Sequence, residues 1–240
     1  MSSKVRCASC AVLAWLTAAS VCFAAEGDYA PRKGGVGGGL GLGQFFGNGD
    51  YSSGARPRFS FSGNFRYVMT KHWRWQFSPG LTWTAYKKEE PTPFVDINFP
   101  ADATKNDQLA LLVPMSAQVQ YVAHTGSWLM HLGAGPGLYR VWVENRRKVL
   151  RDPTTFDLHR GVYPGMSFEL GGERFLKNIT TTSIEITSTT HYVLSRRSDQ
   201  FPNGYNDPVL ASDLRIGVNY YFDLIRAKRT GGALPGLPRN

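Results

Sequence analysis

The chain has 240 residues, of which 42% are hydrophobic and 13% aromatic, and its formal net charge is +9 at pH 7. This length fits one domain, and after Ala25 no apolar run approaches the roughly 20 residues of a membrane-spanning helix, which excludes a helical membrane protein. The basic residues do not gather on an amphipathic helix or on an aromatic RNA-binding strand, so nucleic acid is not an expected partner.

The first 25 residues have the pattern of a secretory signal peptide. A basic start is followed by an apolar run over residues 8–23 and then by small residues, so we expect cleavage near Ala24/Ala25. All three cysteines lie inside this segment. The exported chain is therefore expected to hold no disulfide, no thiolate metal site and no cysteine nucleophile.

Glycines dominate the next segment, residues 34–46. Gly37, Gly39, Gly41 and Gly43 share one face if this segment is a strand, and they would leave room for bulky side chains across a narrow interior. The alternative interpretation is a flexible glycine-rich linker.

The segment from Trp73 to Tyr86 carries a period of two. Its odd positions are apolar or aromatic except for Pro79, and its even positions are polar or small except for the final tyrosine. Residues 57–69 repeat the pattern after a short connection. This alternation predicts strands whose two faces meet different surroundings.

The same alternation predicts eight strands. They cover residues 34–46, 57–69, 73–87, 108–123, 128–144, 160–173, 179–195 and 209–222. The connections are alternately long and short, and the strands are far longer than the roughly 5 or 6 residues usual in globular sheets. These features predict an all-β fold, an eight-stranded antiparallel up-and-down transmembrane β-barrel with its long loops at one end.

Four prolines lie inside the predicted strands, at Pro79, Pro114, Pro136 and Pro164. Proline removes a hydrogen-bond donor from a strand ladder, so we expect bulges or shifted strand boundaries at these positions. Between residues 139 and 142 the apolar alternation also changes phase.

The last predicted strand carries the most specific motif. Its residues 215–222 place Arg215 and Gly217 on one face and the aromatic residues Tyr220 and Phe222 on the other, although soluble β-proteins also end in amphipathic strands. Together with the eight-strand pattern, this motif resembles the assembly signal of the small outer-membrane β-barrel family that includes the membrane domain of OmpA, OmpX and OmpW. The resemblance implies a monomer in the bacterial outer membrane that contacts outer-membrane lipid and the assembly machinery.

The resemblance covers roughly residues 34–222. We therefore expect a signal peptide over residues 1–25, a barrel over 26–222 and a short basic periplasmic tail over 223–240. Members of the family usually end at the terminal aromatic residue, so the tail is a departure from their pattern.

An eight-stranded barrel is just wide enough inside for its own side chains, so the expected interior is a packed polar core, with a gated solute path as the alternative. The polar residues expected to face inward are Asn64, Arg66, Arg74, Gln76, Gln118, Gln120, His131, Glu169, Glu185, Asp213 and Arg215. Buried charges persist when they are paired and hydrogen-bonded. The charged residues expected to form this network are Arg66, Arg74, Glu169, Glu185, Asp213 and Arg215.

The resemblance also raises lipid A hydrolysis, because some barrels of this architecture use a histidine and a serine near the outer rim. His191 is the candidate, with Asp213 across the hairpin and Ser195 or Ser212 nearby. Ser195 lies about 13 Å along the strand, too far for proton transfer, and Val193 occupies the position two residues away where such enzymes have serine. We therefore expect no catalytic residue and no cofactor.

No metal site is expected from the sequence. The histidines, at positions 72, 124, 131, 159 and 191, are scattered along the chain. Asp199, Asn203, Asn206 and Asp207 offer oxygen ligands of the calcium type, but they lack the spacing of a calcium loop and fit turn chemistry.

Two of the long loops are basic. The residues concerned are Arg146, Arg147, Lys148, Arg151, Arg196 and Arg197. Arginine pairs with phosphate through two hydrogen bonds, so these residues are expected to contact lipopolysaccharide, and a merely solvated basic loop is the alternative.

The expected function is that of a non-enzymatic structural or interaction protein acting through its outer loops. Two alternatives remain open: a lipid A-modifying hydrolase centred on His191, and a soluble, exported, lipocalin-like barrel. In the second, the aromatic row from Trp73 to Trp83 would point inward to hold an apolar ligand.

Overall fold

The structure is a computed structural model that describes residues 29–47, 50–52, 54–86, 108–145, 147–177, 179–195 and 208–224. Its long strands are β1 (Lys33–Phe45), β2 (Ala55–Val68), β3 (Trp73–Tyr86), β4 (Gln108–Thr125), β5 (Trp128–Asn145), β7 (Arg160–Leu176), β8 (Ile179–Val193) and β9 (Val209–Asp223). A two-residue strand, β6 (Lys148–Val149), and a 3₁₀ turn, η3 (Asp50–Ser52), lie in the connections. Within the described ranges, no helix is long and apolar enough to span a membrane.

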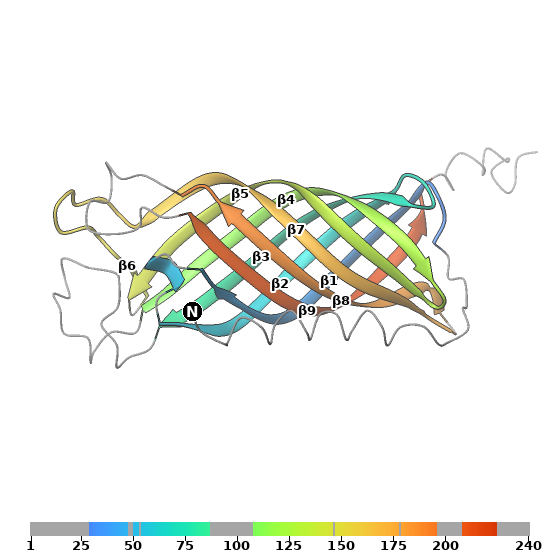
Figure 1. Cartoon of the computed structure of the whole chain (residues 1–240), viewed down its shortest axis with the longest axis horizontal. Coiled ribbons are helices and arrows are strands. Elements are labelled where there is room, and N and C mark those ends of the chain that lie inside the picture. Colours follow the sequence, from blue (N-terminus) through green and yellow to red (C-terminus); the bar gives the residue numbers. More distant parts are fainter. Residues whose placement is uncertain are drawn as a thin grey trace, which may run out of the picture.

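The long strands form one closed antiparallel barrel. Each pairs with the next long strand along the chain, and β1 pairs with β9 from Lys33↔Asp223 to Phe45↔Ala211, which leaves no free edge. The strands cross the barrel at a tilt, and β6 extends one end by pairing with the last residues of β5 (Figure 1). The predicted eight-stranded all-β barrel is confirmed.

The eight predicted strands match the observed long strands to within three residues at every boundary. The agreement follows from the period of two, since each long strand alternates between buried and exposed side chains over most of its length. β6 was not predicted, because two residues are too few to show a period.

The prolines do not cause the expected bulges, so this prediction was wrong. Pro79 pairs with Met115, and Pro114 pairs with Tyr139, with no change of register around them. The ladder is equally regular at the two later prolines. Losing one N–H removes a hydrogen bond but does not change the spacing of the strand. The two register shifts of the described ladders lie elsewhere, next to Pro57 in β2 and Phe175 in β7.

The expected change of phase in β5 is also absent. Tyr139, Val141 and Val143 are buried, whereas Arg140 is exposed, which continues the alternation of the preceding residues. The apolar side chains point inward here because this end of the lumen is apolar. At Tyr139 the inward-facing residues of β5 change from polar or small to apolar, while inward and outward positions keep alternating.

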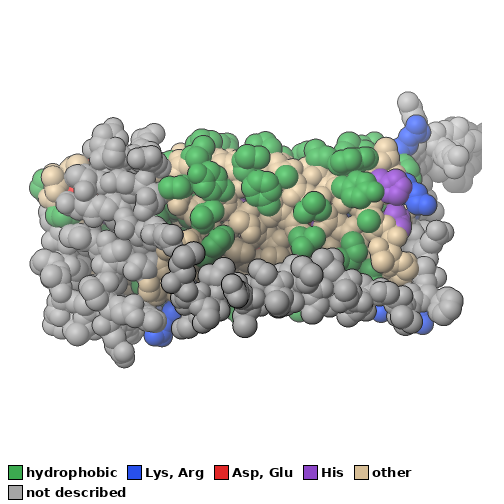
Figure 2. Space-filling model, in the orientation of Figure 1, with side chains coloured by type: hydrophobic (Ala, Val, Ile, Leu, Met, Phe, Trp, Pro, Cys, Tyr) green, Lys and Arg blue, Asp and Glu red, His purple; other side chains and the backbone are tan. Residues whose placement is uncertain are grey.

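Apolar side chains cover the outer wall of the barrel. Exposed positions of β9 carry Leu214, Ile216 and Val218, and the tryptophans at 73 and 75 are 46% and 39% exposed. Hydrophobic side chains are spread across the face of the barrel wall shown in Figure 2. Contiguous apolar surface of this extent is rare on soluble proteins and is what a hydrocarbon environment favours.

The lumen has three layers. At the end that carries the long loops, an apolar cluster includes Phe45, Tyr139, Val141 and, from the loops, Tyr51 and Leu150. A second apolar cluster fills the end that carries the short turns. That cluster consists of Val68, Val122, Leu129, Phe175 and Tyr221, with Tyr29 packed against it. Polar and charged side chains occupy the space between the two clusters.

The glycines of β1 make room for the polar layer. A Cβ at Gly37 would overlap the Asn219 side chain and lie 2.6 Å from the carbonyl oxygen of Val218. Gly41 and Gly43 are similarly crowded by β9 and by Thr82. These glycines are part of a strand, so the alternative of a flexible linker over residues 34–46 is excluded.

Candidate functional site in the barrel lumen

Which polar side chains meet in the lumen depends on the register between neighbouring strands as well as on the type of each side chain. Arg66 of β2 pairs with Gln76 of β3, Gln76 pairs with Gln118 of β4, and Arg74 pairs with Gln120. Because paired residues point to the same side of a sheet, these five residues converge inside the barrel. The structure buries all eleven polar residues expected to face inward.

Two arginines and two glutamates form the most tightly paired part of the layer. Arg66 Nη2 donates to both oxygens of Glu185 at 2.6 Å, and its Nη1 lies 3.3 Å from Glu173 Oε2. Arg74 Nη1 donates to Glu173 Oε2 at 2.6 Å, and its Nη2 lies 3.5 Å from Glu185. Each guanidinium thus contacts both carboxylates, as buried charges require.

Glu173 was missed as a network residue. It also accepts hydrogen bonds from the Tyr221 hydroxyl, at 3.1 Å, and from the Ser183 hydroxyl. The signal was present, because Glu173 lies two and four residues after Gly171 and Glu169 and therefore shares their inward face. Glu173 is the last residue of the strand predicted over 160–173, whereas β7 continues to Leu176.

The remaining predicted charges form a second group, closer to the long loops. Arg215 Nε lies 3.1 Å from Asp213 Oδ1, and Arg215 Nη2 donates to the Thr189 hydroxyl at 2.6 Å. Glu169 accepts from Gln120 Nε2 at 2.6 Å and from Gln76 Nε2 at 3.1 Å. Glu169 Oε2 is 4.0 Å from Arg215 Nη2, within the same group. Gln76 links the two groups, because its Oε1 accepts from Arg66 Nε at 2.6 Å.

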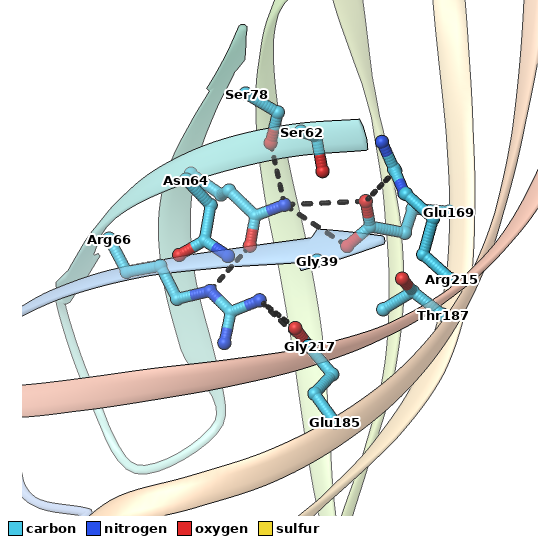
Figure 3. A pocket seen from close by; sticks show the side chains of 11 residues that line it. Gly39, Ser62, Asn64, Arg66, Ser78, Glu169, Glu185, Thr187, Arg215 and Gly217 are labelled. Carbon is cyan, nitrogen blue, oxygen red and sulfur yellow. Dashed lines mark hydrogen bonds and ion pairs between the residues drawn. The ribbon is translucent and has the colours of Figure 1, made fainter. Parts of the chain in front are cut away.

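A cavity of about 10 Å³ lies between the two groups. Figure 3 shows Arg66 directed at Glu185 on one side of it and Arg215 beside Glu169 on the other. This volume is near the lower limit for one water molecule. The polar layer is therefore packed by its own side chains around this cavity.

His191 lies under the apolar cluster at the loop end. Its Nε2 is 3.4 Å from Asp213 Oδ2, and its ring packs edge-on against Tyr139 with centroids 5.5 Å apart. The residue is 2% exposed, and Ser195 is equally buried. His191 thus faces the lumen beside Asp213, as the sequence suggested, but it is covered from the outer rim.

His131 lies between two carboxylates of the network. Its Nε2 is 3.5 Å from Glu169 Oε1 and 3.4 Å from Glu185 Oε1. This grouping was not foreseen, because the three residues are far apart in the sequence and meet only through the pairing of β5, β7 and β8.

No protein-family model matches the chain, and no curated protein matches its sequence. Among solved structures, the chain is similar to Ail, the attachment invasion locus protein of Yersinia pestis, solved with the heparin analogue sucrose octasulfate. The identity is 11% and the TM-score 0.47, over 80% of this chain and 99% of that one. Neisserial surface protein A is similar at 16% identity and a TM-score of 0.48, over 79% and 97% of the two chains. The N-terminal β-barrel domain of Pseudomonas aeruginosa OprF is similar at 11% identity and a TM-score of 0.44, over 80% and 100%.

Because these identities and TM-scores are low, the fold is assigned from the closed pairing of β1 with β9 and not from the comparisons. The chain has the fold of a closed eight-stranded antiparallel β-barrel.

The described basic residues of the loop between β5 and β7 lie on the surface of this barrel. Arg147, Lys148 and Arg151 are all exposed. Two further exposed arginines, Arg140 of β5 and Arg160 of β7, face outward just below them. Neither arginine was predicted as a site residue, although the period of two assigns both to the outer face.

Several sequence predictions fall outside the described residues. These are the signal peptide over residues 1–25, the tail from residue 225 onward, the loop cations Arg146, Arg196 and Arg197, and the oxygen-ligand group Asp199, Asn203, Asn206 and Asp207.

The residues of the closing motif take the faces expected for β9. Arg215 and Gly217 line the lumen, while Tyr220 is 50% exposed on the outer wall. The ring of Tyr220 stacks on that of Phe222, with centroids 6.4 Å apart.

Proposed function

We propose that the chain is a non-enzymatic protein of the bacterial outer membrane, which acts as a structural or interaction protein through its long loops. The observation that carries this proposal is the inversion of the usual soluble pattern. Apolar side chains cover the outside of the closed barrel, and charged side chains fill the middle of the inside. In lipid this arrangement satisfies the backbone groups of the strands without a free edge and presents a mainly apolar wall.

The outward position of the aromatic row speaks against a lipocalin-like ligand carrier. Such a carrier would place Trp73 and Trp75 inside the barrel, yet both lie on the outer wall. The middle of the lumen holds arginine, glutamate and glutamine, which do not suit an apolar ligand.

The burial of His191 supports a non-enzymatic role. A base that acts on lipid A must reach a substrate in the outer leaflet. His191 is instead covered by the apolar cluster that contains Tyr139, and its contact with Asp213 is part of the packed interior. Unchanged lipid A from cells that express His191→Ala and wild-type protein equally would support this role, and a difference in acylation would overturn it.

Fractionation tests the membrane assignment. The full chain is expressed in a Gram-negative host, and the outer-membrane fraction is run on a detergent gel with and without boiling. We expect the protein in that fraction, with a faster band before boiling, because a closed barrel resists the detergent until it is heated. Protein recovered from the periplasm without detergent would refute the assignment.

We also propose that the exposed cations at the loop end contact lipopolysaccharide phosphates. The supporting observation is that the loop and the adjoining wall both carry exposed basic residues: Arg140, Arg147, Lys148, Arg151 and Arg160. Guanidinium groups bind phosphate through two hydrogen bonds. Arg140 also packs over the ring of Trp142, 5.5 Å from its centroid, in the arrangement expected at a membrane interface.

The test compares two triple variants. In the first, Arg147, Lys148 and Arg151 are replaced by glutamine. In the matched control, three exposed cations of the opposite end, Lys71, Arg174 and Lys177, are replaced by glutamine. We expect co-purified lipopolysaccharide to fall several-fold in the first variant and to stay unchanged in the control. Equal lipopolysaccharide in both variants and the wild type would exclude the contact.

The outward aromatic residues of β9 support recognition by the assembly machinery. We propose that Arg215, Gly217, Tyr220 and Phe222 act as the assembly signal, with Tyr220 and Phe222 as the residues open to a partner. Replacing both aromatic residues by alanine should reduce insertion in cells more than replacing Ile216 and Val218 does. Equal insertion of the two double variants would contradict this role.

A further inference from the structure

His131 is a buried histidine whose ring nitrogens lack hydrogen-bond partners among the described residues. It is 2% exposed, and among the described residues neither ring nitrogen makes a hydrogen bond of acceptable geometry. A buried polar group without a partner costs free energy, so such a group calls for a ligand, an ion or a proton. Its Nε2 is aimed between Glu169 Oε1 and Glu185 Oε1.

We propose that His131, Glu169 and Glu185 bind a divalent transition-metal cation of the Zn²⁺ type. Their three donor atoms lie within 4.8 Å of one another. The two distances from the histidine nitrogen, 3.5 and 3.4 Å, match the ligand-to-ligand spacing of a tetrahedral site with metal–ligand bonds of about 2.1 Å. The two carboxylate oxygens, which lie within 4.8 Å of each other, would close to about the same spacing.

The ligand set selects this class of cation. Imidazole nitrogen is a preferred ligand of zinc, copper, nickel and iron, whereas calcium takes about six to eight oxygen ligands. One nitrogen and two carboxylates leave one position of a tetrahedron for water. The cavity of about 10 Å³, which both glutamates line, offers space for that water (Figure 3).

The two glutamates can turn one oxygen to the metal and keep protein partners on the other. Glu185 Oε2 accepts from Arg66 Nη2 at 2.6 Å and from Asn219 Nδ2 at 3.2 Å. Glu169 Oε2 accepts from the Thr189 hydroxyl at 3.2 Å and from Gln76 at 3.3 Å. Partners of this kind fix the orientation of metal-binding carboxylates. The metal would displace Gln120 Nε2 and Gln76 Nε2 from Glu169 Oε1, and it would take Glu185 Oε1 from Arg66 Nη2, which now donates to it at 2.6 Å.

Charge also favours a cation here. The polar layer holds three arginines, Arg66, Arg74 and Arg215, against four carboxylates: Glu169, Glu173, Glu185 and Asp213. With neutral histidines this leaves an excess of negative charge in a desolvated space. A cation at His131 offsets that excess where two of the carboxylates converge.

Gly171 makes the position of the imidazole possible. It lies on β7, two residues after Glu169, and pairs with His131 on β5 and with Thr187 on β8, the strand that carries Glu185. A Cβ at Gly171 would be 2.5 Å from His131 Nε2. A methyl group there would push the imidazole away from Glu169 and Glu185.

The experiment measures metal retained by the folded, signal-processed protein in detergent at neutral pH. Every variant carries His124→Gln, because the rings of His72 and His124 lie 5.9 Å apart at the exposed turn end and offer a competing site. The protein is equilibrated with Zn²⁺, freed of unbound metal and analysed for zinc. Cobalt replaces zinc in a parallel sample, because its visible absorption reports tetrahedral coordination.

We expect about one zinc per chain, a loss of at least tenfold in affinity in His131→Gln, and full retention in His191→Gln. The second variant is the matched control, because His191 is equally buried but contacts one carboxylate. If His131→Gln does not fold, Gly171→Ala takes its place and is expected to lose the tetrahedral cobalt spectrum.

Three results would overturn the proposal. One is the absence of retained zinc in the protein that carries only His124→Gln, in which all three proposed ligands are present. Another is equal retention in His131→Gln and His191→Gln. The last is a nitrogen NMR spectrum in excess zinc that shows both ring nitrogens of His131 protonated, since a proton would then occupy the place assigned to the metal.

Discussion

At the scale of single residues, the polar layer makes the barrel depend on individual buried charges. Glu173 holds two guanidinium groups and accepts further bonds from Tyr221 and Ser183. Removing one partner of a buried ion pair costs about 3–5 kcal/mol, because the other charge is left without compensation. We predict that Glu173→Ala lowers the free energy of unfolding by this amount, measured by urea titration in lipid vesicles.

Asp223 provides the control for that measurement. Its side chain is 57% exposed and lies 3.8 Å from Lys33 Nζ, so it makes an ion pair at the surface. Such pairs contribute roughly 0–1 kcal/mol. Equal losses in Asp223→Ala and Glu173→Ala would contradict the account of a charge-dependent core.

His159, in the loop before β7, predicts a pH effect. Burial lowers its pKa from 6.5 to about 4, and Asp152 offsets part of this shift. Between these values the unfolded chain binds a proton that the folded chain does not, so stability is complete above about pH 6.5 and falls as the pH drops towards 4. The loss is on the order of 3 kcal/mol at the acid end.

The measurement is the free energy of unfolding from pH 7 to pH 4, in the wild type and in His159→Gln. We expect a shallower pH dependence in the variant, whatever its stability at pH 7. Parallel curves for the two proteins would show that the pKa of His159 is the same in the folded and unfolded chains, and the prediction would be wrong.

At the scale of the strand, the glycines of β1 set how closely β9 can approach. A Cβ at Gly37 meets the Val218 carbonyl, which cannot rotate away, so Gly37→Ala should cost roughly 1–3 kcal/mol by overpacking. Gly63 faces outward, with 3.8 Å to its nearest neighbour, and should accept alanine with little loss. The unboiled gel band reports the folded fraction, and equal bands from both variants would refute this role.

The strands themselves could be predicted because a barrel in lipid imposes two different solvents on alternate residues. The inward faces of β2, β3 and β4 followed from that pattern alone. The joint position of His131, Glu169 and Glu185 could not be predicted, because it depends on register between strands that the pattern leaves free. Tyr51 and Leu150 enter the lumen from loops, where no period exists.

At the scale of the whole molecule, the apolar clusters at both ends enclose the polar layer between them. The proposed metal and the network of ion pairs therefore lie in a space with little contact with bulk water. In such surroundings electrostatic interactions are stronger and unpaired groups are more costly. The lumen chemistry and the apolar outer wall thus follow from one architecture, a closed barrel with a polar interior and an apolar exterior.

The direction of that outer wall is the central claim, and spin labels test it most directly. The described residues contain no cysteine, so single cysteines at Leu214, Ile216, Val218 and Tyr220 can each carry a nitroxide without other changes. In vesicles of outer-membrane lipid, we predict that all four labels collide with dissolved oxygen and are shielded from a water-soluble nickel complex. A label at the exposed loop residue Thr154 should show the reverse. Labels on β9 that are accessible to the nickel complex would mean that this face meets water, and the membrane barrel would be wrong.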